Sequence, residues 1–365
     1  MLLGIDRRLV YNVDWVLLGA SLLLALLGVS MIYSATHAGR TPELYLKQLV
    51  LVGLGTLALA CTAAIDYHRL ADRALLLYGA SVVALLYVLK FAPLIAGTRR
   101  WLLIGGFQLQ PSELVKLAAA IFVAKIFSEY RQEVLGLRDV FVPGAAVGLL
   151  VLLIAKQPDL GTAACLLPLL IAVAFLAGLR MRAVATLAAA LVLVAALAWP
   201  LLKDYQRTRI YTFLDPSLDP RGAGYQKIQS QIAVGSGGLV GRGFMEGSQA
   251  QLGYLPARHT DFVFSVLAEE TGFVGVVIVL GLYLLVLWRM LETARLARDR
   301  LGAFLVAGCA GSFGFQVVYN VAMVAGLVPV KGLPLPLMSY GGSSVLSSLM
   351  GIGLVLSVRM RRFAN

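Results

Sequence analysis

The chain has 365 residues, of which 59% are hydrophobic and only 14% carry a charge. Apolar runs long enough to cross a bilayer core of about 30 Å recur along the sequence, so the composition predicts a polytopic membrane protein with no soluble domain of ordinary size. The net charge of +12 does not indicate nucleic-acid binding. Its basic residues form short clusters between apolar runs rather than a stripe with interleaved aromatic residues.

Ten apolar segments predict ten transmembrane helices, and therefore an all-α fold in one membrane-embedded domain covering residues 1–365. The first apolar segment is longer than the core of a signal peptide, so we interpret it as a retained helix. One long polar connection, 203–260, separates the seventh helix from the eighth. The predicted helices are 13–35, 46–65, 71–91, 112–128, 140–156, 160–179, 182–202, 262–288, 302–326 and 341–358.

Arginine clusters fall at alternate ends of these segments, from Arg7 and Arg8 near the start to Arg361 and Arg362 near the end. By the positive-inside rule, both termini are expected in the cytoplasm and the 203–260 loop outside. No nucleotide pool exists on that outer side. A synthetic enzyme with its site there needs a substrate that is already activated.

Asp261 lies where the external loop enters the eighth predicted helix. A carboxylate at such a depth is costly unless it is used, so Asp261 is the first candidate for a functional residue. The alternative is an N-cap, with the carboxylate accepting the N–H of Val263 or Phe264. The neighbouring His259 is a further candidate member of the site.

Two more segments carry polar groups at helix starts. Glu113 and Lys116 are three residues apart on one face of the fourth predicted helix; they either form an ion pair near the membrane boundary or contact a substrate. Ser339 to Gly342 precedes the tenth helix, where hydroxyl groups and free backbone N–H groups favour an anion. The alternative for that turn is a helix cap with small-residue packing.

Three weaker signals remain. The glycine-rich run 235–241 lacks the Lys-Ser/Thr of a phosphate-binding loop, so it is interpreted as flexible or re-entrant. Glu269 and Glu270 lie within the eighth helix. They belong to a proton relay, are buried against polar groups of other helices, or lie in a tilted helix that reaches its boundary sooner. Asp159 is expected to cap a helix in a solvated turn.

Together these motifs resemble the shape, elongation, division and sporulation family. The match runs over most of the chain, and the short termini are more like the elongation branch than the division branch. The motifs are Gln110-Pro111-Ser112-Glu113 with Lys116, Gln157-Pro158-Asp159-Leu160-Gly161-Thr162, Arg258-His259-Thr260-Asp261-Phe262, Glu269-Glu270-Thr271-Gly272 and the run from Gly332 to Gly342.

The resemblance implies a peptidoglycan glycosyltransferase that polymerises lipid II at the outer face of a bacterial cytoplasmic membrane during cell-wall elongation. It implies that Asp261 is the catalytic aspartate. It also implies that the partner is a class B penicillin-binding protein, bound through transmembrane contacts, and that membrane lipids surround the complex. The substrate-binding residues that we expect are Glu113, Lys116, Arg258, His259, Ser339, Tyr340, Gly341 and Gly342.

The chemistry of such a transfer needs a base on the acceptor hydroxyl and positive charge on the departing diphosphate. One carboxylate suffices. Asp261 is expected to act as that base or, as the second choice, to hold a divalent cation, Mg or Mn, at the diphosphate. Two other functions are compatible with the composition. They are a lipid II flippase or other transporter, and a membrane scaffold for the penicillin-binding protein that does no chemistry.

Overall fold

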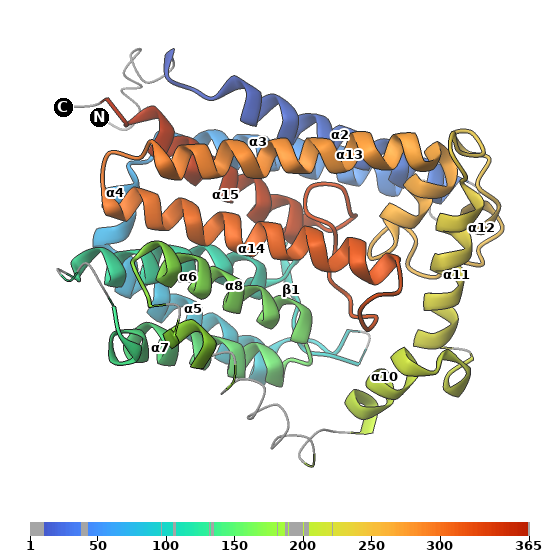
Figure 1. The fold of residues 1–365 in the computed structure, drawn as a ribbon. Coiled ribbons are helices and arrows are strands. Elements are labelled where there is room, and N and C mark those ends of the chain that lie inside the picture. Colours follow the sequence, from blue (N-terminus) through green and yellow to red (C-terminus); the bar gives the residue numbers. More distant parts are fainter. Residues whose placement is uncertain are drawn as a thin grey trace.

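The computed structural model describes residues 11–37, 43–95, 97–104, 107–130, 132, 135–180, 182–186, 189, 200, 204–220 and 222–363. In this part of the chain, long helices run side by side as one bundle, with α10, α11 and α12 at one end and α4 at the other (Figure 1). Seven of the described helices are long and apolar enough to cross a membrane. The expected all-helical polytopic fold is therefore confirmed.

Each predicted helix outside 182–202 coincides with a helix of the structure, and the seventh, 182–202, lies largely outside the described residues. The helices are α2 (Trp15–His37), α3 (Leu44–Ala64), α5 (Ala74–Phe91), α6 (Pro111–Glu129), α7 (Leu137–Lys156), α8 (Leu160–Leu176), α13 (Val263–Arg295), α14 (Arg300–Val324) and α15 (Gly342–Met360).

Several short elements connect them. A hairpin of β1 (Leu102–Ile104) and β2 (Phe107–Leu109) precedes α6, and α4 (Tyr67–Asp72) joins α3 to α5. The sequence analysis did not anticipate the hairpin, because three-residue strands are too short to show an alternating pattern. The loop before α13 contains α10 (Asp204–Leu214), the 3-10 turn η2 (Pro216–Leu218), α11 (Ala223–Ser236) and α12 (Ser248–Gln251).

The two C-terminal helices form the centre of the bundle. In the most apolar 18-residue stretch of each helix, 72% of the residues of α14 and 83% of those of α15 are buried. The corresponding values are only 17% in α5 and 22% in α3. The peripheral helices therefore offer apolar side chains to lipid. Polar residues on α14 and α15 face the protein interior, where they need hydrogen-bond partners.

The helix α13 is kinked at Gly272, which has a φ of 64° that favours glycine. A kink frees backbone groups, and the loop supplies partners for them. The N–H groups of Arg242 and Gly243 donate to the carbonyls of Glu269 (3.0 Å) and Glu270 (3.1 Å). In return, Phe273 N–H donates to Gly238 O at 2.9 Å. Residues 238–243 are therefore bonded to the kink.

The helix α11 lies across the end of the bundle (Figure 1). It is held there by Ser230, whose Oγ lies 2.9 Å from Ser265 Oγ and donates to Val324 O at 2.8 Å. The loop thus packs on the two helices that carry the candidate site.

Candidate functional site

Asp261 sits in a tight turn directly before α13. The carbonyl of Ala257 accepts the N–H groups of Thr260 (3.1 Å), Asp261 (3.1 Å) and Phe262 (3.3 Å). The N-cap of α13 is Phe262, and no side chain caps the helix. The alternative interpretation of Asp261 as an N-cap is therefore wrong.

The carboxylate of Asp261 makes no hydrogen bond or ion pair with the described residues, although the side chain is only partly accessible. Burial raises its pKa to about 6, against the opposing charges of Arg100 and Arg209. A carboxyl group with such a pKa is an effective general base near neutral pH. Its lone pairs are free to accept a proton from a ligand.

Two arginines act electrostatically on this carboxylate, and a lysine belongs to the segment that lies beside it. Arg100 and Arg209 both act electrostatically on Asp261. Burial, together with the charge of Arg209, lowers the pKa of Lys331. The residue after Lys331 is Gly332, where an added Cβ would lie 3.4 Å from Asp261 Oδ2. The site therefore combines one carboxylate with a positive field suited to an anionic group.

The structure brings His259 and Tyr340 together, as the sequence predicted for members of one site. Tyr340 N–H donates to His259 O at 2.8 Å, and the two ring centroids are 5.7 Å apart. Burial and the neighbouring Arg258 lower the pKa of His259, so its imidazole is neutral at pH 7. Arg258 itself donates to the carbonyl of Ala250.

The Ser339–Gly342 turn is tied down by its own hydrogen bonds. Ser339 Oγ accepts Leu335 N–H at 2.8 Å, and Gln48 contacts both Ser339 O (3.2 Å) and Gly341 N–H (3.4 Å). A Cβ at Gly342 would lie 2.9 Å from a methyl carbon of Leu51. Small-residue packing is thus present at this turn, and binding of an anion there stays a prediction.

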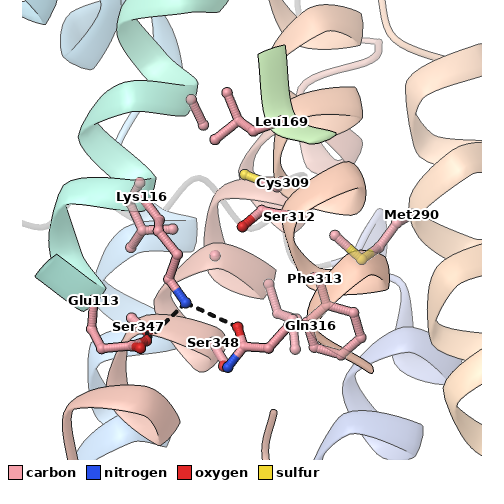
Figure 2. Close-up of a pocket in the computed structure, with 14 residues that line it drawn as sticks. Glu113, Lys116, Leu169, Met290, Cys309, Ser312, Phe313, Gln316, Ser347 and Ser348 are labelled. Carbon is pink, nitrogen blue, oxygen red and sulfur yellow. Dashed lines mark hydrogen bonds and ion pairs between the residues drawn. The ribbon is translucent and has the colours of Figure 1, made fainter. Parts of the chain in front are cut away.

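Glu113 and Lys116 form the predicted ion pair, and both side chains are buried. Lys116 Nζ lies 2.9 Å from Glu113 Oε2 and donates to Gln316 Oε1 at 2.9 Å, while Ser347 Oγ donates to Glu113 Oε2 at 2.9 Å. The pair borders a small cavity of about 40 Å³ that Ser312 also lines (Figure 2). Here the ion pair satisfies two buried charges.

Asp159 is a buried cap, and the expected solvated turn is wrong. Its carboxylate accepts Thr162 N–H at 3.2 Å and the side chains of Gln110 (2.6 Å) and Ser112 (3.2 Å) from the start of α6. Burial raises the pKa of Asp159, and Arg100 opposes that shift. The first and second family motifs therefore meet at Asp159.

Glu269 and Glu270 are buried against polar groups of the 203–260 loop and of α2, which agrees with the predicted burial against other helices. Glu269 accepts the N–H of Gln249 at 3.0 Å and the hydroxyl of Ser248 at 3.2 Å. Glu270 accepts the hydroxyl of Ser34 on α2. In the described chain, no group of three His, Cys, Asp or Glu residues is arranged to hold a metal ion.

This chain is similar to known proteins in both sequence and fold. The family profile for the FtsW, RodA and SpoVE cell cycle proteins matches residues 9–363. The chain is 39% identical to the peptidoglycan glycosyltransferase MrdB of Escherichia coli, covering 93% of this chain and 92% of that protein. It is 31% identical to the peptidoglycan glycosyltransferase RodA of Treponema pallidum, covering 97% and 99%.

Solved structures agree with these matches. One chain, from a study of a peptidoglycan synthase complex that coordinates polymerization and crosslinking, is 40% identical with a TM-score of 0.83, covering 97% of this chain and 99% of that one. The rod shape determining protein RodA of Thermus thermophilus is 34% identical with a TM-score of 0.72, covering 97% and 98%. The chain therefore belongs to the family of FtsW, RodA and SpoVE cell cycle proteins.

Proposed function

We propose that this protein is a RodA-like peptidoglycan glycosyltransferase that polymerises lipid II into glycan strands during cell-wall elongation. The observation that carries the proposal is the carboxylate of Asp261. It makes no hydrogen bond with the described residues, burial raises its pKa to about 6, and Arg100 and Arg209 act on it electrostatically. The relatives named MrdB and RodA, which match over nearly their whole length, support this choice of reaction.

In the proposed reaction Asp261 takes the proton of the acceptor sugar's 4-hydroxyl group. The acceptor oxygen then bonds to the anomeric carbon of the donor, and the bond from that carbon to the polyprenyl diphosphate breaks. Arg100, Arg209 and Lys331 stabilise the negative charge on the departing diphosphate. Because diphosphate leaves readily, the reaction needs no second carboxyl group as a general acid.

The remaining predicted residues have supporting roles in this proposal. Arg258, His259 and Tyr340 shape the loop beside Asp261, and the Ser339–Gly342 turn borders it. Glu113 and Lys116 lie deeper, at the small cavity. They contact substrate only if that cavity widens, and the activity of a double variant at Glu113 and Lys116 tests this role.

The test is a lipid II polymerisation assay with the purified protein in liposomes, with and without a penicillin-binding protein. Glycan polymer made without lipid translocation supports the proposal. Translocation without polymer supports a flippase. A scaffold predicts that Asp261→Asn leaves synthesis by the assembled complex unchanged.

The proposal includes a partner and a location. We place the protein in the cytoplasmic membrane and in a complex with a single-span class B penicillin-binding protein. The support is the related chain from a synthase complex and the apolar residues that α13 exposes, such as Phe273, Ile278 and Trp288. Co-purification in mild detergent tests the complex, and failure to associate with any such protein of the same cell contradicts it.

A further inference from the structure

Two amide side chains on α14 hold a non-helical segment inside the bundle. Residues 329–335, before the turn that leads to α15, lie outside any helix or strand. Their carbonyl groups need donors because lipid and the packed core supply none. Asn320 Nδ2 donates to Leu333 O at 2.8 Å, and Gln316 Nε2, one helical turn earlier, donates to Pro334 O at 2.9 Å.

Asn320 has a second acceptor, the backbone carbonyl of Asp261, at 3.0 Å from Nδ2. The Asn320 side chain is fully buried. Both of its partners are carbonyl oxygens, so only the NH2 group, with its two donors, can face them. The orientation of the amide is therefore fixed, and each of its hydrogens binds a different chain segment.

The two segments joined by Asn320 meet again at the carboxylate. Gly332, next to Leu333, lies against the side chain of Asp261, since an added Cβ there would be 3.4 Å from Oδ2. The two hydrogen bonds of Asn320, to Asp261 O and Leu333 O, set the distance between these two segments. They therefore set how deeply the Asp261 carboxylate is placed beside Gly332 and Lys331.

We propose that Asn320 is a positioning residue that holds Asp261 against the 331–333 segment in the geometry needed for proton transfer. This inference rests on the proposed function, in which Asp261 is the base. Gln316 joins the same segment to the buried pair of Glu113 and Lys116. Its Oε1 accepts a hydrogen bond from Lys116 Nζ, and its Nε2 donates one to Pro334 O. Through Asn320 and Gln316, α14 thus connects Asp261 and Lys116 to the neighbouring carbonyls of residues 333 and 334.

The experiment uses Asn320→Asp, which keeps the shape but loses both donors, and Asn320→Leu, which avoids burying a carboxylate. The matched control is Tyr319→Phe. Its hydroxyl donates to Pro329 O at 3.0 Å, so the control removes a hydrogen bond from α14 to the same region without touching Asp261. Both Asn320 variants should lower kcat about 10- to 100-fold, because a displacement of about 1 Å has that effect.

The control should stay close to wild type, and KM should change little in all three proteins. In Asn320→Leu the acid limb of the pH–rate profile should move to lower pH, because a loosened Asp261 is better hydrated. Wild-type kcat in both Asn320 variants overturns the inference. So does an equal loss in Tyr319→Phe, or a loss of turnover with an unmoved acid limb.

A second measurement separates this inference from the proposed function. Carbodiimide labelling of Asp261 against pH, read by mass spectrometry, reports its ionisation without any turnover. If the wild type makes no polymer, the proposed function fails, while a lower labelling midpoint in Asn320→Leu still supports the positioning role. An identical midpoint in wild type and Asn320→Leu overturns that role.

Discussion

The Nε2 atom of His68 lies 2.7 Å from Oδ2 of Asp299, while Nδ1 of the same ring lies 2.9 Å from Oδ1 of Asp66. This histidine joins the caps of two helices, because Asp66 caps α4 and Asp299 caps α14. Burial alone would lower the pKa of His68, but the two carboxylates outweigh it and raise that pKa. The charged imidazole therefore stabilises the folded protein.

The thermal unfolding midpoint should fall as pH rises through the folded pKa of His68, above its usual value of about 6.5. The sign follows from linkage. A raised pKa contributes stability that is complete below the unfolded pKa and lost above the folded one. His68→Gln should flatten this slope between pH 6 and 8, and His37→Gln, at the C-terminal end of α2, should not. A wild-type slope in His68→Gln would contradict the assignment.

Asp261→Asn should fold, reach the membrane and bind its partner, but polymerise lipid II at least about 100-fold more slowly, because it cannot act as a base. Asp215→Asn is the control, since Asp215 belongs to the same loop and is exposed. Wild-type activity should decline as pH falls through about 6, where Asp261 becomes protonated. Near-normal turnover by purified Asp261→Asn would remove the catalytic role.

The same substitution should make the protein more heat-stable at pH 8. The raised pKa of Asp261 means that the fold disfavours the ionised form, so folding is penalised above pH 6. Asparagine carries no charge and avoids that penalty. The advantage should disappear below about pH 4, where both side chains are neutral. Equal midpoints at pH 8 would show that the carboxylate is not destabilised by its surroundings.

Lys116→Met should destabilise the protein more than the double variant Glu113→Gln/Lys116→Met. The single change leaves a buried carboxylate unpaired, which costs about 3–5 kcal/mol, whereas the double change removes both charges. The exposed pair Lys125 and Glu129 on the same helix offers a control, worth about 1 kcal/mol at most. Normal polymerisation by the folded double variant would reject a substrate role for Glu113 and Lys116.

Gly272→Ala should destabilise the protein by about 2 kcal/mol or more, because φ is positive and a Cβ would lie 2.3 Å from Gly241 N. Gly281→Ala on the same helix meets open space and should be neutral or slightly stabilising. Thermal unfolding in detergent compares the two. A Gly272→Ala midpoint equal to wild type would show that the kink is not required.

Cysteine labelling from outside whole cells should modify Leu218→Cys and not Arg295→Cys, in a background without native cysteines. Leu218 is 61% exposed in the 203–260 loop, and Arg295 ends α13 at the opposite end of the bundle (Figure 1). Ser248 is a poorer reporter because it bonds Glu269. Labelling of Leu218→Cys only after permeabilisation would reverse the predicted orientation.

The sequence was sufficient for the long helices and for choosing Asp261 as a candidate, because both depend on local signals. Apolar runs need no partner to be recognised, and a carboxylate at a membrane boundary is unusual by itself. The predicted end of the eighth helix at 288 fell short of Arg295, because α13 continues beyond the apolar stretch with Arg289 and Glu292, which pair with each other.

The surroundings of Asp261 could not be predicted in the same way. Arg100 and Arg209 reach the site from a hairpin and a loop far away in sequence, and a single chain gives no signal for such proximity. Asn320 looks like an ordinary polar residue in an apolar helix. Only the fold shows that its two donors have carbonyl partners.

The bonding between the 238–243 run and the α13 kink has a consequence for protein engineering. Glycine-rich external loops are ordinarily where tags, reporter domains and epitopes are inserted without harm. Here residues 238, 239, 242 and 243 bond four backbone groups of the α13 kink. The spacing of those four groups therefore fixes the number of residues between Gly238 and Gly243. Fusions in this protein therefore belong at η2, whose backbone bonds are local, and lengthening the glycine run by even one residue would leave the kink unsatisfied in lipid.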